Sequence, residues 1–226
     1  MRQKIRKAAV LGAGVMGSAI AAHLANVGIP SFLLDIVPPE LTEAEKKKGL
    51  TFQSAEVRNR FAVMGKKRIQ ESRPASLYLK EDAELLTVGN FEDHLSWVSE
   101  ADWIIEVVVE DLNLKRELFK KLVPFLKEGT VISSNTSGIS IQKMCEGFSR
   151  DFQEMFLGTH FFNPPRYMKL LEIIPISSTS KSVVDRMAYV GERILGKGVV
   201  YAKDTPNFIG NRIGAFSGAT TMRTMV

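Results

Sequence analysis

The sequence predicts an α/β protein with a doubly wound, mostly parallel sheet, and two observations carry this prediction. The first is the apolar run of residues 5–11, which breaks into the motif Gly12-x-Gly14-x-x-Gly17. A helical pattern follows at once, with one apolar face made of Met16, Ile20, Leu24 and Val27. The second is a series of near-continuous apolar runs of strand length further along the chain, which are typical of parallel strands covered on both faces.

The glycine motif predicts a dinucleotide site because of what each glycine permits. Gly12 permits the tight turn, Gly14 lets the backbone approach a pyrophosphate, and Gly17 lets the helix pack closely on the strand. The free N–H groups and the positive end of the helix dipole then face the phosphates. Val15 and Met16 belong to this first helical turn.

Asp35 decides which nicotinamide dinucleotide is expected. It ends the apolar run 31–34, about 20 residues beyond the glycines, where an acidic side chain accepts hydrogen bonds from ribose hydroxyls. A carboxylate there repels a 2′-phosphate, and no arginine follows within the next several positions. NAD is therefore predicted rather than NADP. The alternative is an aspartate that merely ends a strand.

Composition limits the classes of function. The 226 residues are 45% hydrophobic and 24% charged, which suits a globular protein with a full core. The net charge of +5 suits an anionic ligand, but the charges are interspersed, unlike the basic stretches of nucleic-acid binders. No apolar run reaches the ~18 residues of a membrane span, and the single cysteine, Cys145, excludes an internal disulfide. We expect a cytoplasmic protein that binds neither nucleic acid nor membrane.

The remaining elements follow in order along the chain. Residues 41–72 are rich in charge and predict a helical insertion. Beyond it, strands are predicted at 87–91, 101–109, 130–134, 156–162, 168–174 and 199–201, and helices at 114–125 and 183–195. Glu106 lies inside one of these apolar runs, where it either ends the strand early or faces a polar cavity.

Polar side chains in and after the later strands indicate chemistry. Asn135 and Ser137 follow the strand 130–134, and strand carboxyl ends line the ligand crevice of such sheets. His160 and Glu172 lie within two apolar runs that a short turn separates, so the two strands are expected to be adjacent. An imidazole that meets a carboxylate there is the arrangement of a general base and its orienting group. The alternative is a structural His–Glu pair.

Five segments together resemble the 3-hydroxyacyl-CoA dehydrogenase family, in the family's order and over nearly the whole chain. They are the glycine motif, Ser134-Asn-Thr-Ser137, Gly158-Thr-His-Phe-Phe-Asn-Pro164, Met168-Lys-Leu-Leu-Glu-Ile173 and Lys203-Asp-Thr-Pro-Asn-Phe-Ile-Gly-Asn-Arg212. The long helical insertion is similar to that of bacterial fatty-acid oxidation proteins. The resemblance implies a Rossmann-like NAD-binding domain over residues 1–202. Residues 203–226 are then a linker and the first helix of a truncated, all-helical domain that forms the family's homodimer.

The resemblance also implies an activity, the NAD-dependent oxidation of 3-hydroxyacyl-CoA to 3-oxoacyl-CoA in fatty-acid β-oxidation. His160 would be the general base that removes the C3 hydroxyl proton, and Glu172 would orient it. Ser137 and Asn211 would hold the C3 oxygen and nearby groups of the acyl-CoA thioester. A chain that stops within the helical domain would turn over slowly or not at all.

The cofactor contacts implied by the resemblance extend beyond the glycine motif. Asp35 matches the ligand of the adenosine ribose. The full expected set is Gly12, Gly14, Val15, Met16, Gly17, Asp35, Glu110, Lys115, Asn135, Ser137 and Asn163. Two other functions share the glycine motif: an NAD-dependent dehydrogenase of free 3-hydroxy acids, and a non-catalytic NAD-binding protein. A dehydrogenase of free 3-hydroxy acids would not account for the His-Phe-Phe-Asn-Pro segment together with Glu172.

Overall fold

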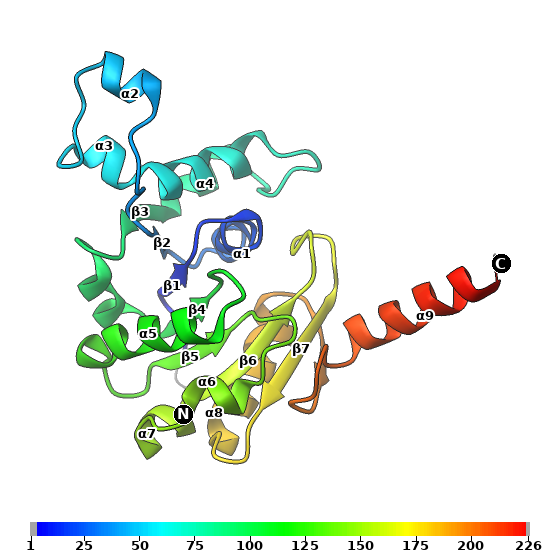
Figure 1. Ribbon diagram of the computed structural model, residues 1–226. Helices are drawn as coiled ribbons and strands as arrows, with labels where there is room; N and C mark the ends of the chain where they lie inside the picture. Colours follow the sequence, from blue (N-terminus) through cyan, green and yellow to red (C-terminus); the bar gives the residue numbers. More distant parts are fainter. Residues whose placement is uncertain (1–3, 225–226) are drawn as a thin grey trace.

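Residues 4–224, the part of the chain that the computed structural model describes, form an eight-stranded sheet between layers of helices (Figure 1). The strands are β1 (Ala8–Leu11), β2 (Ser31–Asp35), β3 (Leu86–Asn90), β4 (Trp103–Glu106), β5 (Val131–Ser134), β6 (Phe156–Phe161), β7 (Leu170–Pro175) and β8 (Gly198–Tyr201). Their order is β3-β2-β1-β4-β5-β6-β7-β8, and every pair is parallel except β6 and β7. The predicted doubly wound, mostly parallel sheet is confirmed.

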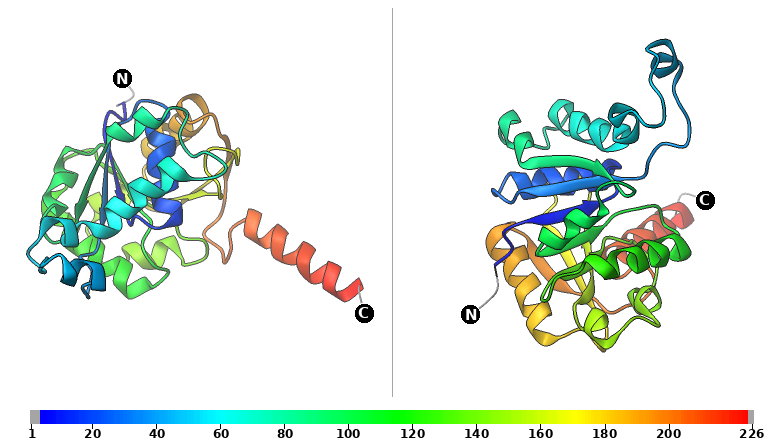
Figure 2. Two further views of the ribbon diagram at one scale, coloured as in Figure 1. Left: turned by 90° about the horizontal axis from the view of Figure 1, so that it is seen from above. Right: turned by 90° about the vertical axis from the view of Figure 1, so that its left-hand side faces the viewer.

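Two apolar cores lie on opposite faces of the sheet. The α-helices are α1 (Val15–Ala25), α2 (Glu43–Lys47), α3 (Ala55–Arg58), α4 (Arg60–Glu71), α5 (Leu112–Leu122), α6 (Ile141–Cys145), α7 (Arg150–Glu154), α8 (Lys181–Tyr189) and α9 (Gly210–Thr224). Successive β1 residues alternate between the cores, because Ala8 and Val10 pack under α1, α4 and α8, and Ala9 and Leu11 pack under α5, α6 and α7. Figure 2 shows the sheet edge-on between these helices.

The helical insertion is more broken than the sequence predicts. Residues 41–72 form three helices, α2, α3 and α4, rather than a continuous one. A capping box between Thr42 and Glu45 starts α2, and Gly49 follows it with a φ of +70°, a conformation that interrupts a helix. α4 packs on the body of the protein, and α3 is joined to it by the ion pairs of Arg58 with Glu92 and Asp93, while α2 extends away (Figure 1).

The last helix, α9, projects away from the sheet (Figures 1 and 2). Its apolar side chains are uncovered, with Ile213 and Phe216 exposed by 64% and 75%. None of its described residues is buried. Within residues 4–224, no helix combines the length and the apolar character needed to cross a bilayer.

Candidate active site

The glycine turn between β1 and α1 leaves open space at the start of the helix. A Cβ at Gly17 would lie 1.8 Å from the Gly12 carbonyl oxygen, whereas a Cβ at Gly14 would meet nothing within 4 Å. Gly12 has a φ of +109°, which strongly favours glycine. No side chain caps α1 and its first turn holds no acidic residue, so its leading N–H groups are available to an anion. This turn fits the pyrophosphate of a dinucleotide.

Asp35 lies directly beside the glycine turn. One carboxylate oxygen accepts a 2.6 Å hydrogen bond from the Ala13 N–H, and the other accepts a 2.7 Å bond from the Ile36 N–H. An ionised carboxylate has roughly four lone-pair positions, so acceptor capacity remains for ribose hydroxyls. The half-buried side chain is thereby fixed at the carboxyl end of β2, where the sequence predicts it.

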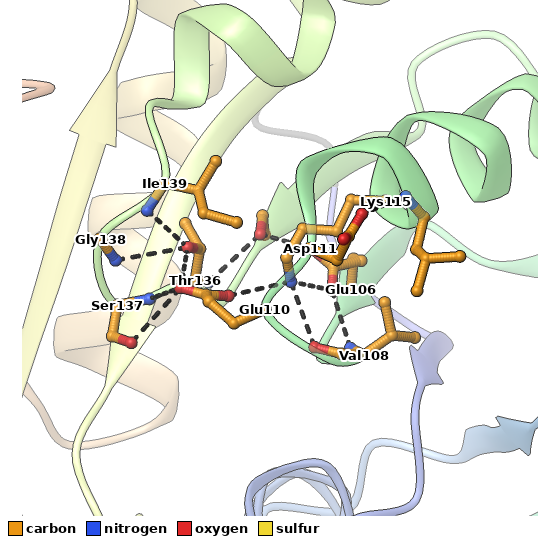
Figure 3. A network of polar contacts seen from close by, with 11 residues as sticks. Glu106, Val108, Glu110, Asp111, Lys115, Thr136, Ser137, Gly138 and Ile139 are labelled. Carbon is orange, nitrogen blue, oxygen red and sulfur yellow. Dashed lines mark hydrogen bonds and ion pairs between the residues drawn. The ribbon is translucent and has the colours of Figure 1, made fainter.

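Glu106 ends β4 and is completely buried, which settles what the sequence leaves open. Its Oε1 accepts a 2.6 Å bond from the Lys115 ammonium and a 2.7 Å bond from the Val108 N–H (Figure 3). Its Oε2 accepts a bond from the Ser134 hydroxyl of the neighbouring strand. Because the Glu106 side chain bonds to the backbone two residues onward, the strand predicted over 101–109 stops there.

Lys115 is 1% exposed, and its ammonium group binds other residues of the protein instead of facing solvent. Besides Glu106, its ammonium donates to the Val108 carbonyl and lies 3.3 Å from Glu110 Oε2 (Figure 3). These partners match its three N–H donors. In this structure Lys115 supports Glu110, whereas the resemblance implies a cofactor contact.

Glu110 connects this network to the loop that carries Ser137. Its Oε1 accepts bonds from the Thr136 hydroxyl and, at 3.0 Å, from the Ser137 N–H (Figure 3). Burial raises the pKa of Glu110, but Thr136, Lys115 and Ser137 outweigh burial and hold that pKa below its usual value. The loop is therefore fixed with the Ser137 side chain exposed.

His160 and Glu172 meet across the antiparallel pair β6–β7. The register places them directly opposite each other, and His160 Nδ1 lies 2.7 Å from Glu172 Oε2. Their exposed fractions are 5% and 0%. Asn135 ties the neighbouring strand to this pair, because its Oδ1 accepts a 2.9 Å bond from the Phe161 N–H. The adjacency of the two strands is confirmed.

Glu172 also contacts the start of α9, which the sequence does not predict. Its Oε1 accepts bonds of 3.0 and 2.7 Å from the N–H groups of Ile209 and Gly210. Asn211 follows in the first turn of α9 and is half-buried. The carboxylate therefore joins His160, on one side, to the helix that carries Asn211, on the other.

Most of the predicted site residues lie at the carboxyl edge of the parallel strands. Asp35 ends β2 and Asn135 directly follows β5; Glu106, which the sequence does not predict as a site residue, ends β4 at the same edge. His160 lies one residue before the end of β6, which runs parallel to β5. Asn163 follows β6 and is exposed in the turn toward β7.

The other histidines and the cysteine lie outside this arrangement. His23 is buried in α1, where burial and the Lys197 charge lower its pKa to about 4. His94 Nδ1 accepts a bond from the Asn90 N–H. Burial raises the pKa of the Cys145 thiol to about 11, as expected for an inert core cysteine. Over residues 4–224, no group of three or more His, Cys, Asp or Glu is arranged to hold a metal ion.

Comparison with known proteins identifies the family. Residues 7–205 match the family model "3-hydroxyacyl-CoA dehydrogenase, NAD binding domain". The whole chain is 56% identical over 226 residues to a probable 3-hydroxyacyl-CoA dehydrogenase of Bacillus subtilis, covering 29% of that protein. Over 216 residues, 96% of the chain, it is 37% identical to a putative fatty acid oxidation complex trifunctional enzyme of Rickettsia felis, covering 28% of it.

A solved structure agrees with these relatives. The 3-hydroxybutyryl-CoA dehydrogenase of Escherichia coli K12 matches with a TM-score of 0.74 and 29% identity, over 94% of this chain and 41% of that one. The chain thus spans less than half the length of these three proteins. Since the family model matches most of the chain and includes the glycine turn and the His160–Glu172 pair, the chain belongs to the 3-hydroxyacyl-CoA dehydrogenase family and contains its NAD-binding domain.

Proposed function

We propose that this chain supplies the NAD site and the proton-transfer pair for the oxidation of 3-hydroxyacyl-CoA to 3-oxoacyl-CoA. The buried contact of 2.7 Å between His160 Nδ1 and Glu172 Oε2 is the observation that carries the proposal. The pair lies at the same edge of the sheet as the glycine turn, which fits the pyrophosphate of NAD. The names of the relatives support the reaction class.

The roles of the residues follow from which atoms are engaged. His160 donates its Nδ1–H to Glu172, which fixes the tautomer and leaves Nε2 to take the proton of the C3 hydroxyl. The Glu172 carboxylate then stabilises the imidazolium that forms. When bound, NAD supplies the hydride acceptor. Ser137 and Asn211 hold the C3 oxygen and nearby groups of the substrate.

The wider proposals concern the pathway and the assembly. The name of the Rickettsia relative supports a place in fatty-acid β-oxidation with an acyl-CoA thioester as substrate.

We propose a domain boundary between residues 202 and 203, with 203–226 beginning a helical domain. Residues 1–3 and 225–226 of these two segments lie outside the described residues. The exposed apolar side chains of α9, which include Ile213 and Phe216, are suited to burial in a homodimer. The single cysteine is compatible with a reducing cytoplasm.

The test is NADH oxidation on addition of acetoacetyl-CoA, with the fluorescence of bound NADH followed in the same sample. Turnover is the expected result if the described residues suffice. Bound NADH without oxidation would assign only the cofactor half of the reaction to this chain, and a longer chain that continues through the helical domain should then restore turnover. Free acetoacetate is the matched substrate control, because its equal consumption would favour a free-acid dehydrogenase. Failure of every substrate with intact NADH binding, even in the longer chain, would favour a non-catalytic NAD-binding protein.

Asp35→Asn is expected to weaken NADH binding about tenfold or more. The substitution removes the charge from a hydrogen-bond acceptor, and a bond to a charged group contributes about 1.5–3 kcal/mol. Fluorescence titration with NADH measures the change in Kd. Asp185→Asn is the control, because Asp185 is an exposed partner of Lys181 on α8. Unchanged NADH affinity in Asp35→Asn would remove Asp35 from the ribose site.

A further inference from the structure

Hydrogen bonds fix the segment between β8 and α9 to the rest of the protein, although a linker is expected there. Asp204 is bound at the start of α6: its Oδ2 accepts a 2.7 Å bond from the Ser140 hydroxyl and a 2.9 Å bond from the Gln142 N–H. Its Oδ1 accepts a 2.9 Å bond from the Ile141 N–H. The Asp204 carboxylate thus accepts three hydrogen bonds from residues 140–142, which directly follow the Ser137 loop.

Asp204 is joined to α9 by a short and tightly folded stretch of chain. The Phe208 N–H donates a 3.0 Å bond to the Thr205 carbonyl. Asn207 and Phe208 have φ values of +63° and +47°, which residues other than glycine rarely adopt. Such a conformation persists only where its surroundings hold it, and Phe208 is buried to 2% exposure among core side chains.

The Phe208–Gly210 end of this stretch contacts the proposed catalytic residues. Immediately after Phe208, the N–H groups of Ile209 and Gly210 donate to Glu172. A Cβ at Gly210 would lie 2.6 Å from the Phe162 ring, so the chain approaches here as closely as a glycine permits. The Phe208 ring lies 5.7 Å, centroid to centroid, from the His160 ring.

The same stretch also approaches the loop of Ser137 directly. A Cβ on Gly138 would lie 3.1 Å from Asn207 Oδ1, which places the Asn207 side chain against this loop. The Ser137 loop and the His160–Glu172 pair come from different strands, and the stretch from Asp204 to Gly210 contacts both.

We infer that Asp204 is a positioning residue, which fixes the Ser137 loop and the His160–Glu172 pair relative to each other. It acts by holding the Asp204–Gly210 stretch so that two backbone N–H groups reach Glu172 Oε1. Glu172 then presents Oε2 to His160 in one orientation. This inference rests on the proposed function for its catalytic meaning, but the contacts themselves can be tested without turnover.

The experiment compares Asp204→Ala and Asp204→Asn with Asp102→Ala in the 226-residue chain. Asp102 is the matched control, because it also accepts two backbone N–H groups, of Arg6 and Lys7, and one side-chain donor, Lys127. It precedes β4, at the opposite end of that strand from Glu106. NMR gives the amide hydrogen-exchange rates of Ile209 and Gly210 and the ring-nitrogen signals of the histidines, and chemical denaturation gives global stability.

We expect Asp204→Ala to speed exchange at Ile209 and Gly210 by about tenfold or more and to shift the ring-nitrogen signals of His160. Asp204→Asn keeps one acceptor and should give a smaller change. Asp102→Ala should lower global stability without either local effect. Unchanged exchange and unchanged His160 signals in Asp204→Ala would overturn the inference, as would equal changes in Asp102→Ala. If Asp204→Ala changes the exchange rates and the His160 signals as expected, but the protein never oxidises NADH, the result would count against the proposed function and not against this inference.

Discussion

His160→Ala is expected to fold, to keep NADH binding and to lower turnover by about 10²–10⁴, the contribution of a positioned general base. In the proposed function, the substitution removes the nitrogen that takes the C3 hydroxyl proton. It leaves Glu172 buried but not unpaired, because the N–H groups of Ile209 and Gly210 still donate to Oε1. The measurement is kcat for acetoacetyl-CoA reduction, in the form of the protein that turns over, beside the Kd for NADH.

His94→Gln is the control for this prediction. His94 follows β3, which lies at the opposite edge of the sheet from β6, β7 and β8, and its ring centroid is 4.2 Å from that of Trp97. Its replacement should leave kcat unchanged. Near-normal turnover in His160→Ala would exclude His160 as the base, and the pair with Glu172 would then be structural.

Lys115→Met is expected to lower the free energy of unfolding by about 3–5 kcal/mol, because removing one partner of a buried ion pair leaves the other charge uncompensated. Glu106 and Lys115 are 0% and 1% exposed and lie 2.6 Å apart. Urea denaturation measures the loss. Lys120→Met is the matched control on the same helix, since its pair with Glu117 is exposed and is worth at most about 1 kcal/mol.

The effect of Lys115→Met should depend on pH. Burial raises the pKa of Glu106, against the opposing effects of Lys115 and Ser134, and loss of Lys115 raises it further. The folded variant then holds a proton that the unfolded chain, with a glutamate pKa of about 4.3, releases. Stability therefore falls as pH rises above that value. A loss equal at pH 4 and pH 7 would contradict this account of Glu106.

The elements with strong local signals could be predicted from the sequence. The glycine turn, Asp35 at the end of β2 and the adjacency of His160 and Glu172 each follow from apolar runs whose length and order leave few arrangements. A parallel sheet then places the strand ends at one edge. The contacts of these residues with a substrate and with NAD stay predictions.

The remaining features depend on packing that no local pattern encodes. Glu106 interrupts an apolar run. Only its ion pair with Lys115, which lies in the following helix, explains why a buried carboxylate is tolerated there. Residues 41–72 have helical periodicity but form three helices, and at the break between α3 and α4 the side chains of Arg58 and Asn59 bind residues 90–93, at the end of β3. The proline and asparagine near Asp204 indicate a linker, whereas the carboxylate of that residue binds a helix far away in the sequence.

The reversal of direction between β6 and β7 has a consequence for how the site is assembled during folding. His160 and Glu172 lie only 12 positions apart, because antiparallel neighbours need just a short loop. Loop-closure entropy for such a contact is small. The Asp35 contact with Ala13 spans 22 positions and the Asn135 contact with Phe161 spans 26, each through an intervening crossover. The two residues proposed to transfer the proton are therefore encoded in one short stretch, whereas residues proposed to contact the cofactor come from segments further apart in the sequence.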